Sequence, residues 1–273
     1  MMTVSPSAGV IGAELSGVNL AELDDDSVKA IREAWLEHQV VFFRDQNLSP
    51  DQFLAFARSL GDLARYPFLP GIDGYPDIIA VTKLPDEQIN FGGIWHSDTA
   101  YLDEPPMATT LLAREVPASG GDTMFASQYA AYDALSPAMK ELLDPLRAVN
   151  SSAMADVSKT REDRIREHEG DELACYEAVH PVVRTHPETG RKGLYVNIAH
   201  TARFDGMTED ESRGLLQFLF HHQVKPEFTC RFHWEVGSLA LWDNRCVQHN
   251  PVNDYHGFKR VMHRITLRGD RPF

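Results

Sequence analysis

The 273-residue chain has few cysteines and no long apolar run. Its three cysteines, Cys175, Cys230 and Cys246, lie far apart and form no CxxC pair, which excludes a disulfide framework and favours a reducing compartment. No apolar stretch approaches the roughly 20 residues that span a bilayer. The N-terminal Met-Met-Thr-Val-Ser-Pro also lacks the basic and apolar parts of a signal peptide. We therefore expect a cytoplasmic protein without a membrane partner.

Positive charge is also scarce, with 26 Lys and Arg residues against 40 Asp and Glu residues and a net charge of −14. Such a chain repels nucleic acid and anionic membranes, so neither is predicted as a partner. A small anionic ligand would need a local cationic pocket. The length and the 43% of apolar residues suit a globular protein, and we predict one domain over residues 1–273.

Two side chains that can bind a metal ion, His96 and Asp98, lie two residues apart in the stretch from Gly92 to Tyr101. In an extended backbone, residues i and i+2 project to the same side. Composition alone predicts roughly two His-x-Asp/Glu pairs in such a chain, and there are three. The pair is therefore a weak signal unless other residues complete it.

His249, which ends the pattern Trp-Asp-Asn-Arg-x-x-x-His, is the matching third ligand. Two histidines and one carboxylate on one face of an octahedron are the ligand set of non-haem Fe(II) oxygenases. The other two pairs have no such company. His186 and Glu188 lie in a turn pattern, where a solvated histidine is expected. His233 and Glu235 lie in a polar–apolar alternation that is typical of a plain strand face.

The segment from Arg260 to Leu267 alternates in a way that predicts a strand. Arg260 and Arg264 would then point to the same side of that strand. Two guanidinium groups that face inward repel each other unless they hold anions such as carboxylate, sulfonate or phosphate. A solvated face on an edge strand is the alternative. Because the arginines follow His249 by 11 and 15 residues, we favour a site for two anions beside a metal.

Helical and strand patterns cover most of the remaining chain. Amphipathic spacing and N-cap residues predict helices over residues 24–38, 49–61, 127–143 (broken at Ser136-Pro137) and 209–222. Strands are predicted over residues 12–20 (with a turn), 40–44, 77–82, 109–114, 121–126, 180–184, 194–197, 230–234, 238–242, 247–249 and 261–267. Many short strands with a few outer helices indicate an α+β fold with a double-stranded β-helix (jelly-roll, cupin-like) core and flanking helices.

Three segments lack a regular pattern. Residues 65–74 and 83–94 read as loops close to the motif that holds His96, and we expect both to wall a substrate pocket. Residues 149–177 are polar and strongly charged. Such a segment fits a solvated, mobile connection, or a lid over residues 150–177 that closes on the metal site. Both interpretations stay open.

The ordered motifs resemble one family. His96-x-Asp98, a Gly-Gly-Asp-Thr stretch, the pattern that ends at His249, and Arg260-x-x-x-Arg264 resemble the TauD/TfdA (taurine dioxygenase) family of Fe(II)/2-oxoglutarate-dependent dioxygenases, over about residues 12–273. The resemblance implies Fe(II) ligands, 2-oxoglutarate contacts and a contact to the anionic end of the substrate. The implied Fe(II) ligands are His96, Asp98 and His249. The implied contacts to 2-oxoglutarate are Thr123 and Arg260, and the implied contact to the substrate is Arg264.

The resemblance also implies the reaction, in which O2 and 2-oxoglutarate give succinate and CO2 while a C–H bond of a small anionic organic substrate is hydroxylated. Four pocket positions depart from taurine dioxygenase. Tyr66 stands at the place of a His, Gly92 of an Asn, Thr99 of a Val and His200 of a Phe. These departures argue against taurine and favour larger or aromatic anions, namely alkyl sulfates, sulfonates, aryloxy acids and other carboxylates. Tyr66, Thr99 and His200 are expected to line the substrate pocket.

Two alternatives from other classes remain. One is a non-catalytic small-molecule binding barrel that keeps the metal as structure. The other is a zinc hydrolase that uses the same three ligands to activate water. Metal content, and dependence on O2 and 2-oxoglutarate, would separate these from the oxygenase. Members of the family often form dimers or tetramers, so a homodimer or homotetramer is expected by analogy.

Overall fold

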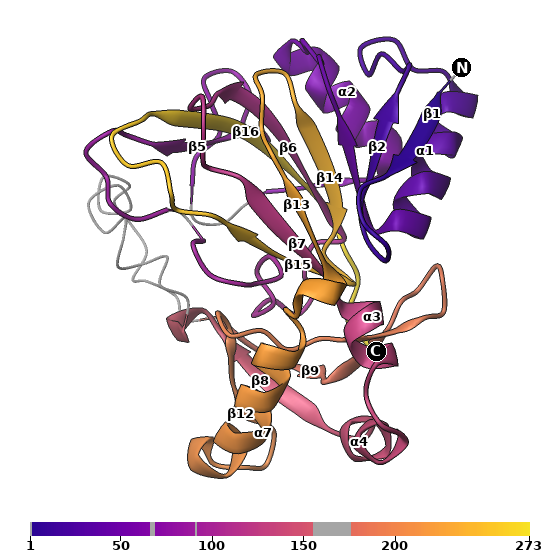
Figure 1. Cartoon of the computed structure of the whole chain (residues 1–273), viewed down its shortest axis with the longest axis vertical. Helices are drawn as coiled ribbons and strands as arrows, with labels where there is room; N and C mark the ends of the chain where they lie inside the picture. The colour runs from indigo at the N-terminus through magenta and orange to yellow at the C-terminus, as the bar shows by residue number, and fades with distance from the viewer. Residues whose placement is uncertain (1, 66–68, 91, 155–175) are drawn as a thin grey trace.

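The computed structural model describes residues 2–65, 69–90, 92–154 and 176–273 (Figure 1). Its largest element is a sheet with the strand order β1-β2-β3-β14-β6-β16-β4, in which β5 also pairs with β16. The strands are β1 (Thr3–Pro6), β2 (Ala13–Ser16), β3 (Val40–Phe43), β14 (Leu239–Asp243), β6 (Ala108–Glu115), β16 (Arg260–Leu267), β4 (Leu63–Ala64) and β5 (Ile79–Lys83).

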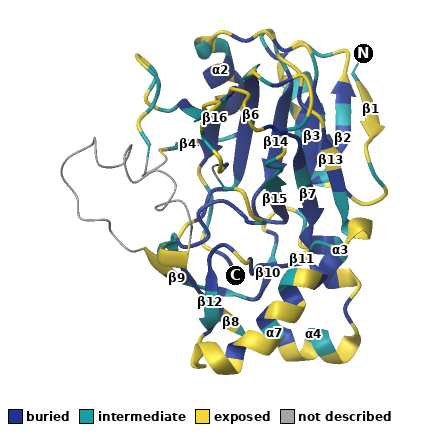
Figure 2. Ribbon diagram, turned by 60° about the vertical axis from the view of Figure 1, so that its left-hand side comes forward, coloured by how far each residue is buried: buried dark blue, intermediate teal, exposed yellow. Residues whose placement is uncertain are grey.

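A second antiparallel sheet faces the large one across an apolar core. It consists of β13 (Thr229–Phe232), β7 (Thr123–Ser127) and β15 (Val247–Pro251). Phe42 of β3 stacks on Phe232 of β13, with 4.1 Å between the ring centroids, and Phe125 of β7 packs into the same cluster. In Figure 2 the facing strands are buried along most of their length. This arrangement confirms the predicted jelly-roll core.

Helices α1 (Asp25–His38) and α2 (Pro50–Leu60) cover the outer face of the large sheet. Both begin where the sequence predicts. The side chain of Asp24 accepts a hydrogen bond from the Ser27 amide at 2.8 Å. Ser49 and Gln52 form a reciprocal capping box, which satisfies amide groups that a helix start leaves unpaired. Among the described residues, no helix is both long and apolar enough to cross a membrane.

The chain between β7 and β13 builds a third layer below the two facing sheets in Figure 1. It holds a three-stranded sheet, a hairpin and the flanking helices, packed around an apolar cluster of their own. The elements are β8 (Arg147–Ser151), β9 (Glu177–Pro181), β12 (Thr201–Phe204), β10 (Val183–Thr185), β11 (Lys192–Leu194), α3 (Gln128–Asp133), α4 (Pro137–Leu143), α7 (Glu209–His222), and the 3-10 turns η1 (Ser152–Met154) and η2 (Pro226–Phe228).

Two predictions in this layer are wrong. Residues 149–177 were predicted to be irregular, but residues 149–151 belong to strand β8, which pairs on both sides. Its polar Asn150 is buried and accepts a hydrogen bond from Thr201 at 2.7 Å, so the strand has no visible apolar alternation. The strand predicted over 194–197 is confined to 192–194. The lid prediction falls mainly on residues 155–175, outside the described residues. One domain over residues 1–273 stays a prediction.

Candidate metal centre

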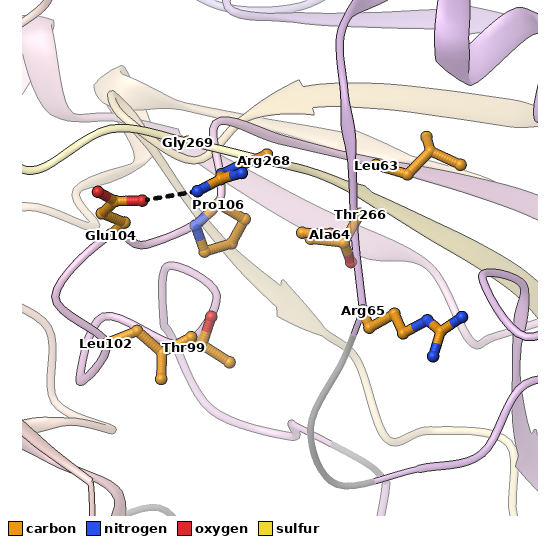
Figure 3. A pocket seen from close by; sticks show the side chains of 10 residues that line it. All are labelled: Leu63, Ala64, Arg65, Thr99, Leu102, Glu104, Pro106, Thr266, Arg268 and Gly269. Carbon is orange, nitrogen blue, oxygen red and sulfur yellow. Dashed lines mark ion pairs between the residues drawn. The ribbon is translucent and has the colours of Figure 1, made fainter.

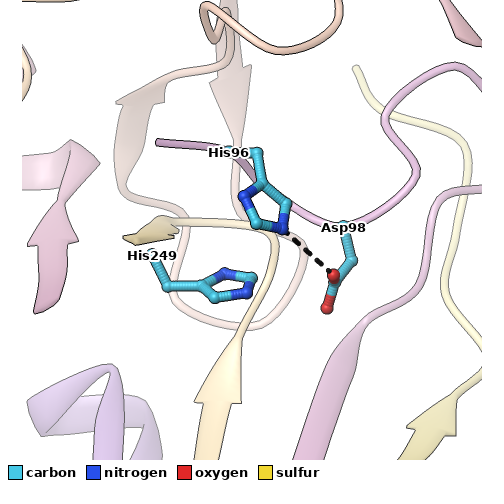
Figure 4. Close-up of side chains that lie close together, drawn as sticks. All are labelled: His96, Asp98 and His249. Carbon is cyan, nitrogen blue, oxygen red and sulfur yellow. Dashed lines mark ion pairs between the residues drawn. The ribbon is translucent and has the colours of Figure 1, made fainter. Parts of the chain in front are cut away.

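The structure brings His96, Asp98 and His249 together at one end of the space between the two facing sheets (Figure 4). His96 and His249 exchange two backbone hydrogen bonds, of 3.1 and 2.8 Å. These bonds hold the loop that contains His96 against strand β15. One ligand atom from each of the three residues lies within 4.8 Å of the others. These three donor atoms are close enough to bind one ion together, as the predicted ligand set requires.

The two histidines offer lone pairs rather than protons. Nδ1 of His96 lies 2.7 Å from the carbonyl oxygen of Ile94, and because a carbonyl only accepts, this nitrogen carries the proton. The lone pair is then on Nε2, which lies 3.8 Å from Oδ1 of Asp98. Burial lowers the pKa of His96 and lowers that of His249 much further. Both rings are therefore neutral near pH 7, which metal binding requires.

Asp98 is held as a carboxylate at the centre of the site. Burial opposes its ionisation, but the Arg264 guanidinium, His249 and His96 outweigh it and keep the pKa of Asp98 well below its usual range. The Thr109 hydroxyl donates to its Oδ2 at 2.6 Å. Asn244 in turn donates to the Thr109 oxygen at 3.0 Å. The carboxylate thus has one orientation, set by strand β6 and by the turn that follows β14.

Replacing Thr109 with Val is expected to weaken binding of Mn(II), a redox-stable stand-in for Fe(II), by about 10- to 100-fold, because outer-shell partners orient metal ligands. The fold should persist, since valine has the same shape. The measurement is anaerobic calorimetric titration. Thr110→Val is the matched control, because this neighbouring hydroxyl donates to the Ile265 carbonyl, at 3.4 Å, and to no other group among the described residues. Equal affinities in the two variants would contradict the role of Thr109.

Arg260 and Arg264 both point inward, as predicted, and each is 6% exposed. Nη2 of Arg264 lies 3.0 Å from Oδ2 of Asp98. The sequence predicts that both arginines face anions, and for Arg264 one such anion is the Asp98 carboxylate. The guanidinium therefore lies directly against the candidate metal centre.

Arg260 has a different environment. Its Nε and Nη2 are buried and have no hydrogen-bond partner among the described residues, and its Cζ lies 5.7 Å from the centroid of the Trp234 ring. The indole of Trp234 donates to Oγ1 of Thr123 at 3.0 Å. That bond occupies the Thr123 oxygen as an acceptor, so its own proton remains available to donate. A buried cation and a free hydroxyl proton around one indole suit a carboxylate ligand.

Three of the four remaining positions of the predicted pocket lie next to candidate metal ligands. His200 is buried, and its ring centroid lies 6.0 Å from that of His96. Thr99 is buried beside Asp98 and has the positive φ of 41°, which a β-branched residue rarely adopts. Gly92 lies against His96: a Cβ there would approach Nε2 of that ring to 3.2 Å. Tyr66 lies outside the described residues.

Sequence reasoning missed Thr109, Asn244 and Trp234. Thr109 and Trp234 look like ordinary residues of a strand or a strand end, and only their long-range hydrogen bonds give them a role. Asn244 had a signal, because it lies inside the motif that ends at His249.

The expectation of a solvated His186 is wrong. The side chain is 2% exposed and its Nε2 lies 3.0 Å from Oδ2 of Asp243. Because its Nδ1 accepts hydrogen bonds from the amides of Glu188 and Thr189, Nε2 carries the proton and donates. His186, Asp243 and Cys246 lie close enough for a metal, but this geometry commits the first two to each other.

The pair His233 and Glu235 also differs from the plain strand face that its pattern predicts. Both residues follow the end of β13 at Phe232. Nδ1 of His233 lies 2.7 Å from Oδ1 of Asp122. His233 therefore braces the segment that precedes β7, whereas the Glu235 carboxylate lies 3.9 Å from Nη1 of Arg44.

Comparison with known proteins gives a consistent result. Residues 3–266 match the family model described as "Taurine catabolism dioxygenase TauD, TfdA family". The chain is 37% identical to an alpha-ketoglutarate-dependent sulfate ester dioxygenase of Pseudomonas putida, over 99% of this chain and 91% of that protein. It is 35% identical to an alkylsulfatase of Acinetobacter baylyi, over 96% of this chain and 83% of that protein. The crystal structure of a taurine dioxygenase from Burkholderia xenovorans superposes with a TM-score of 0.84 at 36% identity, covering 99% of this chain and 90% of that one.

Proposed function

The chain belongs to the taurine catabolism dioxygenase TauD/TfdA family. From its similarity to two relatives that are named for sulfate esters, we propose that its substrate is an organic sulfate ester. It is an alpha-ketoglutarate-dependent dioxygenase that hydroxylates a small anionic organic molecule. Fe(II) with O2 and 2-oxoglutarate supplies the oxidising power and yields succinate and CO2. Hydroxylation of the carbon next to the ester oxygen would leave a product that breaks down to an aldehyde and sulfate.

His96, Asp98 and His249 are proposed to hold the metal. The fit rests on the donor set: neutral imidazole nitrogens and an ionised carboxylate, within 4.8 Å of one another. The lone pair of His96 is directed by its bond to Ile94, and the carboxylate is directed by Thr109. These side chains therefore need little rearrangement to bind an ion, which lowers the cost of binding.

Arg260 and Thr123 are proposed to bind the far carboxylate of 2-oxoglutarate. The observation that carries this is the buried guanidinium of Arg260, which has two nitrogens without partners among the described residues. Tyr255 and Asp122 offset the burial of this charge only in part, and a carboxylate of the cosubstrate would pair with the two remaining nitrogens. Trp234 leaves the Thr123 proton free to point at the same carboxylate.

Arg264 is proposed to bind the sulfate group of the substrate while it still touches Asp98. His200, Thr99 and Tyr66 are proposed to line the rest of that pocket. His200 and Thr99 lie next to metal-site residues. Burial and the nearby His96 lower the pKa of His200 to about 3, so the ring stays neutral and adds no third charge. The two sulfate-ester relatives support sulfate over taurine, as do the departures at these positions.

The test combines a spectrum with a substrate screen. Under anaerobic conditions the Fe(II)-loaded protein should develop a visible absorption band when 2-oxoglutarate is added, and the His96→Ala variant should not. In air, ethyl and hexyl sulfate should stimulate succinate release more than taurine or phenoxyacetate do. A band without any preference for sulfate esters would overturn the substrate proposal alone. No band in folded, iron-loaded protein would overturn the proposed ligands.

Arg260→Ala is expected to raise the KM for 2-oxoglutarate by tens-fold, corresponding to the roughly 1.5–3 kcal/mol of a charge-assisted hydrogen bond. The measurement is succinate formation against 2-oxoglutarate concentration at saturating substrate. Arg264→Ala is the matched variant on the same strand, and it should weaken the sulfate ester while leaving 2-oxoglutarate nearly unaffected. Equal losses for both ligands in both variants would contradict the division of roles.

The binding-barrel and zinc-hydrolase alternatives lose their basis, because the family and the named relatives are oxygenases. A homodimer or homotetramer and a cytoplasmic location stay predictions. Size-exclusion chromatography with light scattering would test the first of them.

A further inference from the structure

A cavity of about 270 Å³ is lined on one side by Thr99, the residue that follows Asp98 in the chain (Figure 3). Its inner wall consists mainly of small, apolar or hydroxyl-bearing residues, namely Leu63, Ala64, Thr99, Leu102, Pro106 and Thr266. In Figure 3, Thr99 and Leu102 face across the cavity toward the strands that carry Ala64 and Thr266. Its volume is near the lower limit for pockets that hold small organic ligands.

Residues that line the cavity are direct neighbours, in the chain or in the sheet, of residues at the proposed metal site. Thr266 is paired with Thr109 of β6 on one side and with Ala64 of β4 on the other. Directly opposite side chains in a sheet share a face, so all three point inward. Thr109 bonds to Asp98, and Thr99 is the next residue after it in the chain. Thr266 also follows Arg264 by two residues and shares its side of β16.

The hydroxyl of Thr266 indicates that a ligand belongs there. Thr266 is 6% exposed, and its buried Oγ1 has no hydrogen-bond partner among the described residues. Buried polar groups are normally paired. Thr99, on the opposite wall, has its φ of 41°, and strain of this kind concentrates at ligand-binding sites.

The charges at the rim are already neutralised, which decides the class of ligand. Arg268 lies 3.5 Å from Glu104, and Arg65 lies 3.5 Å from Asp77. The interior therefore offers apolar walls and one hydroxyl rather than a second anion site. A neutral carbon chain with a single oxygen would match it.

We propose that this cavity binds the uncharged end of the substrate, as a straight carbon chain with one ether or hydroxyl oxygen opposite Thr266. The inference rests on the proposed function, which supplies the anion at Arg264. It predicts how the affinity for the substrate depends on the length of its carbon chain and on the position of an oxygen atom in that chain.

The test uses a series of alkyl sulfates from ethyl to octyl, with KM from succinate release and Kd from anaerobic calorimetry on the Fe(II)- and 2-oxoglutarate-loaded enzyme. In the wild type each added methylene should tighten binding about fourfold until the cavity is full. In Ala64→Phe, which fills the cavity, this dependence on length should vanish while ethyl sulfate binds as before. A retained length dependence, or an equal loss for ethyl and hexyl sulfate, would overturn the proposal.

A second variant tests the hydroxyl without changing the shape of the wall. Pentyl sulfate and 2-ethoxyethyl sulfate have chains of equal length that differ by one oxygen. Thr266→Val should shift the ratio of their affinities toward pentyl sulfate by roughly two- to tenfold. An unchanged ratio would overturn recognition of the oxygen. Failure of every sulfate ester to stimulate the wild-type enzyme would instead refute the proposed function, so the two failures are distinguishable.

Discussion

Replacing His249 with alanine is expected to abolish 2-oxoglutarate-dependent succinate release while the protein stays folded. The side chain is a proposed metal ligand, so its loss should exceed the roughly 10- to 100-fold effect of an outer-shell change. Alanine introduces no buried charge, and the backbone bonds to His96 do not depend on the side chain. The fold should therefore tolerate the change better than the chemistry does.

Thermal melting with Mn(II) separates binding from activity. A ligand that binds only the folded state stabilises it by about 2.7 kcal/mol at 100 times its Kd. The wild-type melting temperature should therefore rise with Mn(II), whereas that of His249→Ala should not. His221→Ala is the control, because this histidine lies on the exposed end of α7 and its ring contacts the Gln217 carbonyl of the same helix. A Mn(II) response in His249→Ala equal to that of the wild type would remove this residue from the metal site.

The candidate ligands could be predicted because three short motifs suit one kind of metal site: His96-x-Asp98, the pattern that ends at His249, and the two arginines that follow it. His96, Asp98 and His249 carry the donor types of one known ligand set, and the spacing of the arginines after His249 added an independent sign. Helix starts were predictable for a local reason: Asp24 and Ser49 cap amide groups within three residues of themselves. Signals of this kind lie within a short window of sequence.

The predictions that were wrong concern side chains whose hydrogen-bond partners lie far away in the sequence. His186 looks solvated in its own turn, yet its partner Asp243 lies 57 residues further along the chain. Strand β8 was missed because buried Asn150 is satisfied by Thr201, 51 residues away. Thr109 is oriented by Asn244, which is 135 residues distant. A polar side chain that is satisfied over long range cannot be distinguished, in one sequence, from one that is satisfied by water.

The second large expected effect is on stability, and it concerns Asp243, the buried hydrogen-bond partner of His186. Asp243 accepts hydrogen bonds from Nε and Nη2 of Arg245, at 2.8 and 2.7 Å. Arg245 also bonds to Glu188, which continues to Arg32 of α1. Burial opposes the ionisation of Asp243, but Arg245 and His186 hold its pKa below the usual range. The network joins α1 and the β10–β11 hairpin to the turn that leads into β15.

Arg245→Met is expected to lower the free energy of unfolding by about 3–5 kcal/mol, because it leaves the Asp243 charge buried without its main partner. Urea denaturation measures this, and Arg213→Met is the control. Arg213 pairs with Asp210 on the exposed face of α7, where such a pair contributes little.

The double variant Asp243→Asn/Arg245→Met gives the decisive comparison. It removes the stranded charge, so it should be more stable than Arg245→Met alone, even though it carries one more substitution. It should also bind Mn(II) better than the single variant, since the turn that holds Asn244 would be under less strain. If the two losses of stability simply add, Arg245 acts through packing rather than through its charge.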